Sequence, residues 1–255
     1  MGRFLERDRK RLNNRKNCDI MKISMEMEQR ILELYNEIQG EKREIFENFR
    51  ALLLEYNQKY NLTTILEEKD VYYKHFLDSA VGVDFFEKNG KVAEIGSGAG
   101  FPSIVLKILR PDLTFSLFES IGKKCEFLSV VVDKLGLKGV NIYNVRAEDG
   151  ARDGKFREKF DYATARAVAR MNSLSEYCLP FVRVGGKFIA YKSGDLMEIK
   201  EAESAYKILG AKCERVIPYS LPENYGDRSL AIVKKIKATP SRYPRGQGRE
   251  RKSPL

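Results

Sequence analysis

The sequence is poor in the residues on which metal and redox chemistry depend. It has one histidine, His75, no tryptophan, and four cysteines that form no CxxC pair. We therefore expect no disulfide framework, no zinc site and no metal cofactor. No run of about 18 apolar residues occurs, which excludes a membrane-spanning helix. The basic first 20 residues lack the apolar segment of a secretory signal, so we expect a cytoplasmic protein.

The positive charge is concentrated at the two ends. The 255 residues include 46 Lys and Arg against 36 Asp and Glu, a net charge of +10. Residues 1–23 carry +5 and residues 234–255 carry +7, so the part between them carries −2. A nearly neutral body with basic arms is typical of a protein that binds a polyanion such as RNA. Arms that serve only solubility are the alternative.

The hydrophobic pattern changes its period along the chain. From Met25 to Phe86, apolar residues recur at spacings of three and four, which predicts helices. After Gly90, short β-branched or aromatic runs alternate with helical segments, which predicts a parallel sheet covered on both faces. The last two runs lack a convincing helix between them and predict an antiparallel pair at one edge. The expected strands are 91–95, 114–119, 140–148, 160–167, 185–193, 213–220 and 228–236, and the expected helices in this part are 102–109, 123–135, 172–182 and 196–209.

The first expected strand leads into a glycine-rich turn, VAEIGSGAGFPSIVLKI (92–108). The dinucleotide fingerprint GxGxxG requires a glycine where Phe101 stands, so NAD fits poorly. Phe101-Pro102-Ser103 contains no lysine, so a Walker-type ATP site fits worse. The three glycines of the turn are Gly96, Gly98 and Gly100.

S-adenosylmethionine has no phosphate, and it needs a close backbone approach together with carboxylates for its ammonium and ribose groups. The glycines permit that approach. We expect Glu94 to face the ammonium group directly or through water, and the free amides after Pro102 to meet the methionine carboxylate. We expect Glu119, at the end of the second strand, to accept hydrogen bonds from the ribose hydroxyls. Ala147 and Glu148, at the end of the third strand, are expected to line the adenine end.

Seven strands that end in an antiparallel pair resemble the class I S-adenosylmethionine-dependent methyltransferase fold, a Rossmann-like α/β architecture with a mostly parallel sheet and here an N-terminal helical extension. We expect four parts: a basic, disordered extension (1–24), a helical cap (25–89), the methyltransferase domain (90–237) and a basic Pro-rich tail (238–255). The tail has few apolar residues and is expected to be disordered when alone. Its removal is expected to weaken RNA binding and to leave S-adenosylmethionine affinity unchanged.

Seven motifs, in order, look like those of the RsmG/GidB family, which methylates N7 of a guanine in small-subunit (16S) ribosomal RNA. They are YNLTTI, KHFLDSA, EIGSGAGFPSIVLKI, ESIGKKCEFL, NVRAED, ATARAVARMNSLSEYCLP and VGGKFIAYKSG, and the resemblance covers about Met25 to Lys237. It implies an RNA-binding enzyme of rRNA processing that takes S-adenosylmethionine and acts on ribosomal RNA or the ribosomal subunit. We expect a monomer without membrane or metal partners.

The resemblance also implies roles for individual residues. The family more often has Asp where Glu94 and Glu119 stand, so both carboxylates reach one carbon further here. Ser103 stands where the family commonly has glycine. The cofactor contacts that the resemblance implies are Gly96, Phe101, Ala147, Glu148 and Arg166.

Arg166 could also recognise guanine, because an arginine fork matches the O6/N7 edge. A fork on N7 would block the methylated atom, so a role against the cofactor, a phosphate or O6 alone is preferred. An ion pair of Arg166 with Asp161 or Glu148 is the structural alternative.

Three more residues are candidates on the substrate side. His75 and Asp78 lie one helical turn apart on one face. By themselves they favour a structural hydrogen-bonded pair, whereas the resemblance implies a role in closing the pocket or holding RNA. Lys192, at the end of the fifth strand, is expected either to contact a phosphate or to be an ordinary surface lysine.

Methylation of guanine N7 is compatible with a chain that has few reactive side chains. Guanine N7 has an in-plane lone pair and no proton, so its methylation needs positioning and exclusion of water rather than a base; no residue is predicted to be catalytic. Cys178 would be the nucleophile of a pyrimidine C5 methyltransferase, but it lies on an apolar helical face and is expected to be structural. A methyltransferase of the same fold acting on another RNA base or a small molecule, and a non-catalytic ribosome assembly factor, stay open as alternatives.

Overall fold

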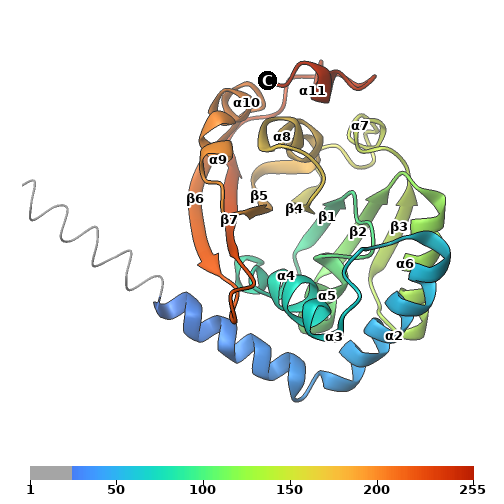
Figure 1. The fold of residues 1–255 in the computed structure, drawn as a ribbon. Helices are drawn as coiled ribbons and strands as arrows, with labels where there is room; N and C mark the ends of the chain where they lie inside the picture. Colours follow the sequence, from blue (N-terminus) through green and yellow to red (C-terminus); the bar gives the residue numbers. More distant parts are fainter. Residues whose placement is uncertain (1–24) are drawn as a thin grey trace, which may run out of the picture.

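The computed structural model describes residues 25–255 and folds them around one sheet with helices on both faces (Figure 1). The sheet has seven strands in the order β3-β2-β1-β4-β5-β7-β6. The first five run parallel, and β7 pairs antiparallel with both β5 and β6. This arrangement confirms the fold class expected from the sequence. The strands are β1 (Lys91–Ile95), β2 (Thr114–Glu119), β3 (Val140–Asn144), β4 (Phe160–Arg166), β5 (Val182–Ser193), β6 (Ala211–Ser220) and β7 (Asp227–Lys235).

The helices form two layers. Residues 25–39 are helical. The helical elements that follow are α2 (Arg43–Tyr60), α3 (Glu68–Asp70), the π-helical η1 (Val71–Leu77), α4 (Asp78–Ala80), η2 (Val83–Phe85), α5 (Ser103–Leu109), α6 (Gly122–Lys134), α7 (Ala147–Gly150), α8 (Met171–Cys178), η3 (Leu179–Phe181), α9 (Met197–Glu201), α10 (Glu203–Ile208) and α11 (Arg249–Lys252). The first helical segment, α2, α4, α5 and α6 cover one face of the sheet, while α8, α9 and α10 cover the other (Figure 1). Across residues 25–255, no helix combines the length and apolar character that crossing a membrane requires.

Two predicted boundaries are wrong. The third strand ends at Asn144 because its last partner, Glu119, ends β2, and a strand without a ladder partner does not continue. Ala147 and Glu148 therefore begin the short helix α7 instead of ending the strand. The helix predicted over 172–182 stops at Cys178. Pro180, which has no N–H to donate, lies in the tight turn that follows.

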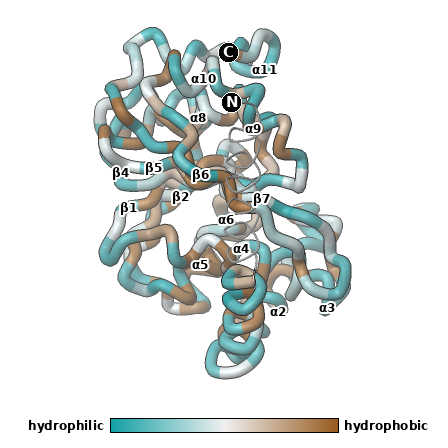
Figure 2. Tube along the Cα trace, turned by 90° about the vertical axis from the view of Figure 1, so that its left-hand side faces the viewer, coloured by the Kyte–Doolittle hydropathy of each residue, from teal (hydrophilic) through white to brown (hydrophobic). Residues whose placement is uncertain are grey.

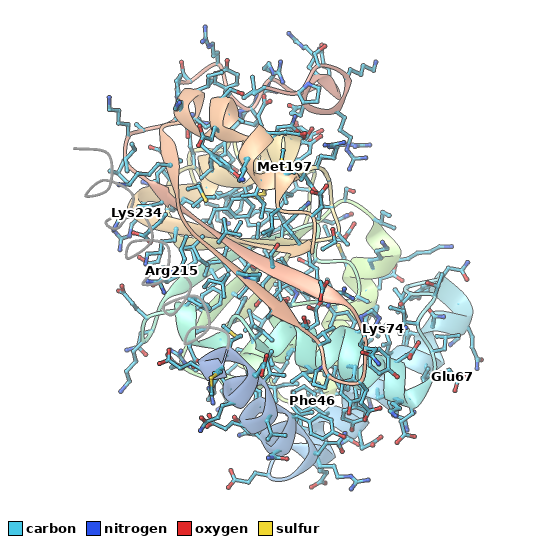
Figure 3. The ribbon with its side chains drawn as sticks, turned by 60° about the vertical axis from the view of Figure 1, so that its left-hand side comes forward. Phe46, Glu67, Lys74, Met197, Arg215 and Lys234 are labelled. Atoms are coloured by element: carbon cyan, nitrogen blue, oxygen red, sulfur yellow. The ribbon has the colours of Figure 1, made fainter. Side chains whose placement is uncertain are left out.

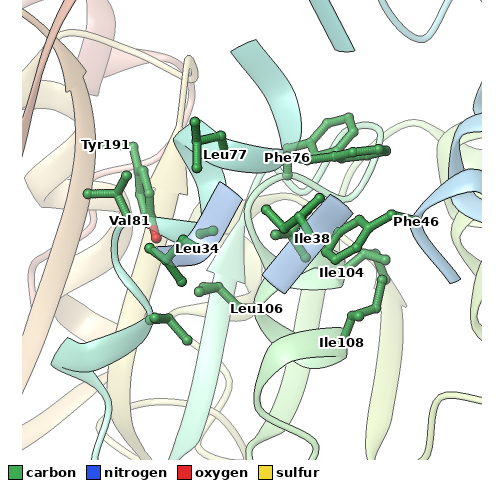
Figure 4. Packing of buried hydrophobic residues seen from close by; sticks show 14 of the residues in the cluster. Leu34, Ile38, Phe46, Phe76, Leu77, Val81, Ile104, Leu106, Ile108 and Tyr191 are labelled. Carbon is green, nitrogen blue, oxygen red and sulfur yellow. The ribbon is translucent and has the colours of Figure 1, made fainter. Parts of the chain in front are cut away.

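Each face of the sheet has its own hydrophobic core. Alternate residues of β2 point to opposite faces, so Leu117 belongs to one cluster and Phe118 to the other. Apolar segments gather at the sheet and polar ones outside it (Figure 2). In the first cluster, Leu34, Ile38 and Phe46 of the cap helices pack with residues of α5 (Figure 4). The helical cap thus shares a core with the sheet, which ties its position to that of the strand ends.

The C-terminal segment 238–255 is not a disordered tail in the structure. Arg157 donates hydrogen bonds to the carbonyls of Tyr243 and Thr239 at 2.9 and 2.8 Å, and the Tyr243 ring is buried. In the folded chain this segment is held by arginine-to-carbonyl hydrogen bonds and an ion pair, which its low apolar content does not reveal; disorder of the segment when alone stays a prediction. The extension expected over 1–24 lies outside the described residues.

Candidate functional site

The glycine turn between β1 and α5 is built from three residues with left-handed backbone angles. The φ angles of Gly96, Gly98 and Gly100 are 68°, 57° and 87°. A Cβ at Gly96 would lie 2.8 Å from Cγ2 of Val168, and one at Gly100 would lie 2.5 Å from Cγ1 of Ile104. A Cβ at Gly98 would meet nothing nearer than a backbone oxygen at 3.8 Å. The first and third glycines are therefore required by internal packing, while the second borders open space.

Two buried carboxylates hold the backbone of this turn through hydrogen bonds. Oε2 of Glu119 accepts a hydrogen bond from the Gly98 amide at 2.9 Å, and Oε1 accepts one from the Ile121 amide at 2.8 Å. Glu94 accepts hydrogen bonds from the Ser103 amide at 3.2 Å and from the Ser103 hydroxyl. Both carboxylates thus stabilise the backbone conformation that makes the site.

These contacts bear on two expectations about the turn. Glu94 is 0% exposed and accepts hydrogen bonds from Ser103; a contact of its carboxylate with a cofactor ammonium group stays a prediction. The Ser103 amide is bonded to Glu94 and is not free for the methionine carboxylate. The serine that departs from the family pattern is therefore the residue that holds Glu94.

Replacing Glu94 with glutamine is expected to change how stability depends on pH. Burial raises the pKa of Glu94 to about 7 from its usual 4.5. Since the folded-state pKa is the higher one, this group's contribution to the free energy of unfolding is fully present below pH 4.5 and is lost as the pH rises through about 7. Urea unfolding of Glu94→Gln and wild type should show the variant gaining stability relative to wild type between about pH 5 and about pH 8. Other titrating groups cancel in that difference, so a constant difference over this range would contradict the raised pKa.

A cavity of about 340 Å³ opens at the ends of β1 to β4. It contains three of the expected cofactor contacts, Gly96, Ala147 and Glu148. Gly98, Phe101, Glu94, Glu119 and Arg166 do not line it. The cavity residues that the sequence analysis missed are Ile95, Phe118, Ser120, Val145, Arg146, Val168, Tyr177, Gly248 and Arg251.

Most of these missed residues follow directly from strand ends. Ser120 comes after β2, and Val145 and Arg146 come after β3. The rule that ligands bind beyond the carboxyl ends of parallel strands could have found them. Gly248 and Arg251 belong to the C-terminal segment, and no sequence signal placed them here.

A second cavity, of about 370 Å³, lies beside the first and contains all the substrate-side candidates. Near it, the turn between β6 and β7 lies beside Lys74 of the cap (Figure 3). The Tyr225 ring in this turn stacks on Tyr73 at 4.6 Å and lies 5.2 Å from the Lys74 ammonium. The cap, β5 and β7 therefore enclose this cavity together. Its lining residues are Ile65, Lys74, His75, Asp78, Arg166, Ala167, Tyr191, Lys192, Ser193 and Arg228.

Arg166 is the centre of a polar network in the second cavity. One guanidinium nitrogen donates to Oδ2 of Asp78 and to the Lys74 carbonyl, both at 2.9 Å. The other terminal nitrogen lies 3.1 Å from Nδ1 of His75. Oδ1 of Asp78 also accepts a hydrogen bond from the Tyr219 hydroxyl at 2.8 Å. The network fixes an arginine and a carboxylate at the wall of the cavity.

The network differs from both structural alternatives expected for these residues. Arg166 pairs with neither Asp161 nor Glu148 in the described structure; Asp161 pairs with Arg183 at 2.6 Å. The side chains of His75 and Asp78 both contact Arg166, and the hydrogen bond between the two residues runs from the Asp78 amide to the His75 carbonyl. Tertiary packing of the cap against β4 brings these groups together.

His75 is held in its neutral form. Because an arginine can only donate, Nδ1 of His75 must accept, and the proton is on Nε2, which lies 2.9 Å from the Thr63 hydroxyl. Burial and the nearby Arg166 charge lower the pKa of His75 to about 3. The imidazole stacks on the Phe101 ring at 4.3 Å, so the Phe101 side chain supports the second cavity.

Lys192 and Cys178 also have defined surroundings. Lys192 lines the second cavity, but its ammonium group pairs with Glu198 at 2.7 Å and donates to the Ala169 carbonyl at 3.1 Å. Lys192 is therefore ion-paired in the structure, and its contact with a phosphate stays a prediction. Cys178 is fully buried, and burial raises the pKa of its thiol, as expected for a structural cysteine. Among residues 25–255, no group of three or more His, Cys, Asp or Glu side chains is placed to hold a metal ion.

Comparison with known proteins agrees with this architecture. Residues 42–224 match the model of the GidB family, described as rRNA small subunit methyltransferase G. The chain is 47% identical over 217 residues to ribosomal RNA small subunit methyltransferase G of Brevibacillus brevis, covering 84% of this chain and 91% of that protein. It is 46% identical to the protein of the same name from Lachnoclostridium phytofermentans, covering 83% and 89% of the two chains.

The fold is shared with much more distant proteins. An S-adenosylmethionine-dependent O-methyltransferase of Thermotoga maritima superposes with a TM-score of 0.50 at 14% identity, covering 64% of this chain and 66% of that chain. This likeness concerns the fold alone. Together with the extent of the family match, these findings show that the chain belongs to the GidB family of S-adenosylmethionine-dependent rRNA small subunit methyltransferases.

Proposed function

We propose that this chain transfers the methyl group of S-adenosylmethionine to N7 of a guanine in small-subunit ribosomal RNA. The observation that carries the proposal is the adjacency of the two cavities at the end of β4. Arg166 and Ala167 line the second cavity, and Val168, two residues beyond Arg166, lines the first. A cofactor in the first cavity and a base in the second would meet across this short segment.

The residues of the first cavity fit the cofactor. When bound, S-adenosylmethionine supplies an electrophilic methyl group on a sulfonium. Gly96 lines this cavity and Gly98, in the same turn, borders open space, so a ligand can approach the backbone closely there; Glu148 adds a carboxylate to the cavity lining. Glu119 acts indirectly, because it holds the Gly98 amide and the chain after β2.

The second cavity fits a guanine that needs positioning and no base. The contacts of Arg166 use three of its five N–H groups, which leaves two that can donate to O6 or to a phosphate. Neutral His75 is engaged with Arg166 and Thr63 and holds the guanidinium in place. N7 carries no proton, so the absence of an available base among the lining residues agrees with attack by its lone pair. Holding both reactants in line can contribute roughly 7–11 kcal/mol to lowering the barrier.

Other chemistries of the same fold find less support. A pyrimidine C5 methyltransferase would need an accessible thiolate, whereas the Cys178 side chain is 0% exposed. Thr164-Ala165-Arg166-Ala167 stands where an amino methyltransferase would have an Asn/Asp-Pro-Pro-Tyr/Phe motif. A purely structural assembly factor would not require a formed cofactor cavity.

We expect one N7-methylguanine to disappear from small-subunit ribosomal RNA when the protein is removed from its cell. Borohydride reduction and aniline cleavage convert this modification into a strand break that primer extension locates. The break should return when the wild-type chain is restored, and stay absent with Arg166→Ala. An identical cleavage pattern with and without the protein would contradict the proposed reaction.

We also propose that the chain acts as a monomer in the cytoplasm and that it consists of three parts, residues 25–89, 90–237 and 238–255.

The near-neutral body and basic ends favour a substrate with an extended phosphate backbone. Methylation of naked RNA and of the assembled subunit, compared at equal concentrations, would identify the form that is modified.

A further inference from the structure

The C-terminal segment reaches the cofactor cavity. Gly248 and Arg251 line the same cavity as Gly96 and Glu148. The Arg251 guanidinium donates a hydrogen bond to the Val168 carbonyl at 3.2 Å. Residues nearly at the end of the chain thus complete a wall that the strand ends leave open.

The segment is held there by buried polar contacts. Arg245 forms an ion pair with Glu176 at 2.7 Å, and the Glu176 side chain is 0% exposed. The Ser173 hydroxyl donates to the Glu250 carbonyl at 2.6 Å, and the Gly246 amide bonds to the Glu250 carboxylate. A buried carboxylate without its partner is costly, so the Arg245–Glu176 pair fixes where the segment lies. Figure 1 shows α11 beside α8, the helix that carries Ser173 and Glu176.

Arg251 lies at the Glu148 end of the cavity. Both residues, together with Tyr177, line it, and the charges of Arg251 and Glu148 both act on the Tyr177 hydroxyl. The glycine turn, where a methionine moiety needs close backbone approach, borders the same cavity through Gly96, which packs against Val168. Beyond Val168, the Arg251 guanidinium shares the cavity wall with Tyr177 and Glu148, and Glu148 follows the strand end where the adenosine moiety is expected.

We propose that Arg251 is a cofactor-binding residue that contacts the adenosine moiety of S-adenosylmethionine, and that the C-terminal segment is part of the cofactor site. The proposal rests on the methyltransferase function proposed above. A planar guanidinium can lie against an aromatic base and still donate hydrogen bonds at its edge. This proposal differs from the expectation that removing the segment weakens RNA binding and leaves S-adenosylmethionine affinity unchanged.

Arg251→Ala is expected to weaken the binding of S-adenosylmethionine by about tenfold, measured by isothermal titration calorimetry. The same loss is expected for 5′-methylthioadenosine, which has the adenosine moiety but no amino-acid part. Arg249→Ala is the matched control: it removes the same charge from the same short helix, and Arg249 bonds to Gln247 and does not line the cavity. The control should stay within about twofold of wild type, because an exposed charge has little effect at a distance under screening salt.

A deletion of residues 248–255 gives a second measurement that keeps the Arg245–Glu176 pair. The deletion should weaken the binding of both ligands at least as much as Arg251→Ala does. Circular dichroism should confirm that the shortened chain is folded. Equal affinities of Arg251→Ala and Arg249→Ala, or tighter binding in Arg251→Ala, would overturn the proposal. A loss seen with S-adenosylmethionine alone would also overturn it, since that result places Arg251 at the amino-acid part. If the wild-type chain bound neither ligand, the proposed function itself would fail.

Discussion

Arg166→Ala is expected to lower the rate of RNA methylation by roughly 100-fold and to reduce the free energy of unfolding by about 3–5 kcal/mol. The Asp78 side chain is only 7% exposed, and Arg166 is its partner at 2.9 Å. Removing the guanidinium leaves a buried carboxylate with the Tyr219 hydroxyl as its hydrogen-bond donor and with the Arg228 guanidinium farther away, at 3.8 Å. The same change releases His75, so the wall of the substrate cavity loses its shape. Initial rates on ribosomal RNA and urea unfolding measure the two effects.

Two further variants separate the stability effect from the functional one. Arg166→Met with Asp78→Asn removes both charges, so it should recover most of the lost stability and little of the lost rate. Arg183→Ala breaks the ion pair between Arg183 and Asp161. The Arg183 side chain is 52% exposed, so the free energy of unfolding should change by less than about 1 kcal/mol. A near-normal rate in the double variant would show that Arg166 contributes only to folding.

Gly98→Val is expected to abolish S-adenosylmethionine binding while the chain still folds. The φ of Gly98 is 57°, a conformation that costs a side-chain-bearing residue about 1–2 kcal/mol. A Cβ there meets no neighbour closer than 3.8 Å, so the native packing is not disrupted. The valine methyl groups would instead occupy the space beside the turn that the ligand needs. Calorimetry with S-adenosylmethionine measures the loss.

Gly136→Val is the matched control for this effect. Gly136 has a similar φ of 63°, no atom lies within 4 Å of its Cβ position, and it lies after α6, away from the cofactor cavity. Both variants should lose a similar amount of stability, and only Gly98→Val should lose the cofactor. Unchanged affinity in Gly98→Val would mean that the glycine turn is not the cofactor site.

The strand order around the site depends on local order along the chain. The alternation of β1, α5 and β2 produces hydrophobic periods that can be read directly, and Gly96 follows a strand end whose position the periods reveal. In a parallel sheet all the strand ends lie at one edge. A cavity at this edge was therefore predictable in outline, and Gly96, Ala147 and Glu148, which line it, are among the residues predicted to bind the cofactor.

The errors concern contacts between segments far apart in the chain. The structural alternative for Arg166 was an ion pair with Asp161 or Glu148, but Arg166 pairs with Asp78, 88 residues earlier. Periodicity tells which face of an element is apolar, yet it does not tell which partner a polar side chain will meet.

The sequence by itself determined the fold class, the glycine turn and the family, because hydrophobic period, backbone-permissive glycines and ordered motifs are properties of neighbouring residues. Only the tertiary structure decided which polar groups face each other. The cap helices bring His75 and Asp78 to Arg166, and the Arg245–Glu176 pair holds the segment that places Arg251 at the cavity beside the glycine turn. Such pairings arise from packing of distant elements, where a buried charge must find its partner, and no local pattern encodes them.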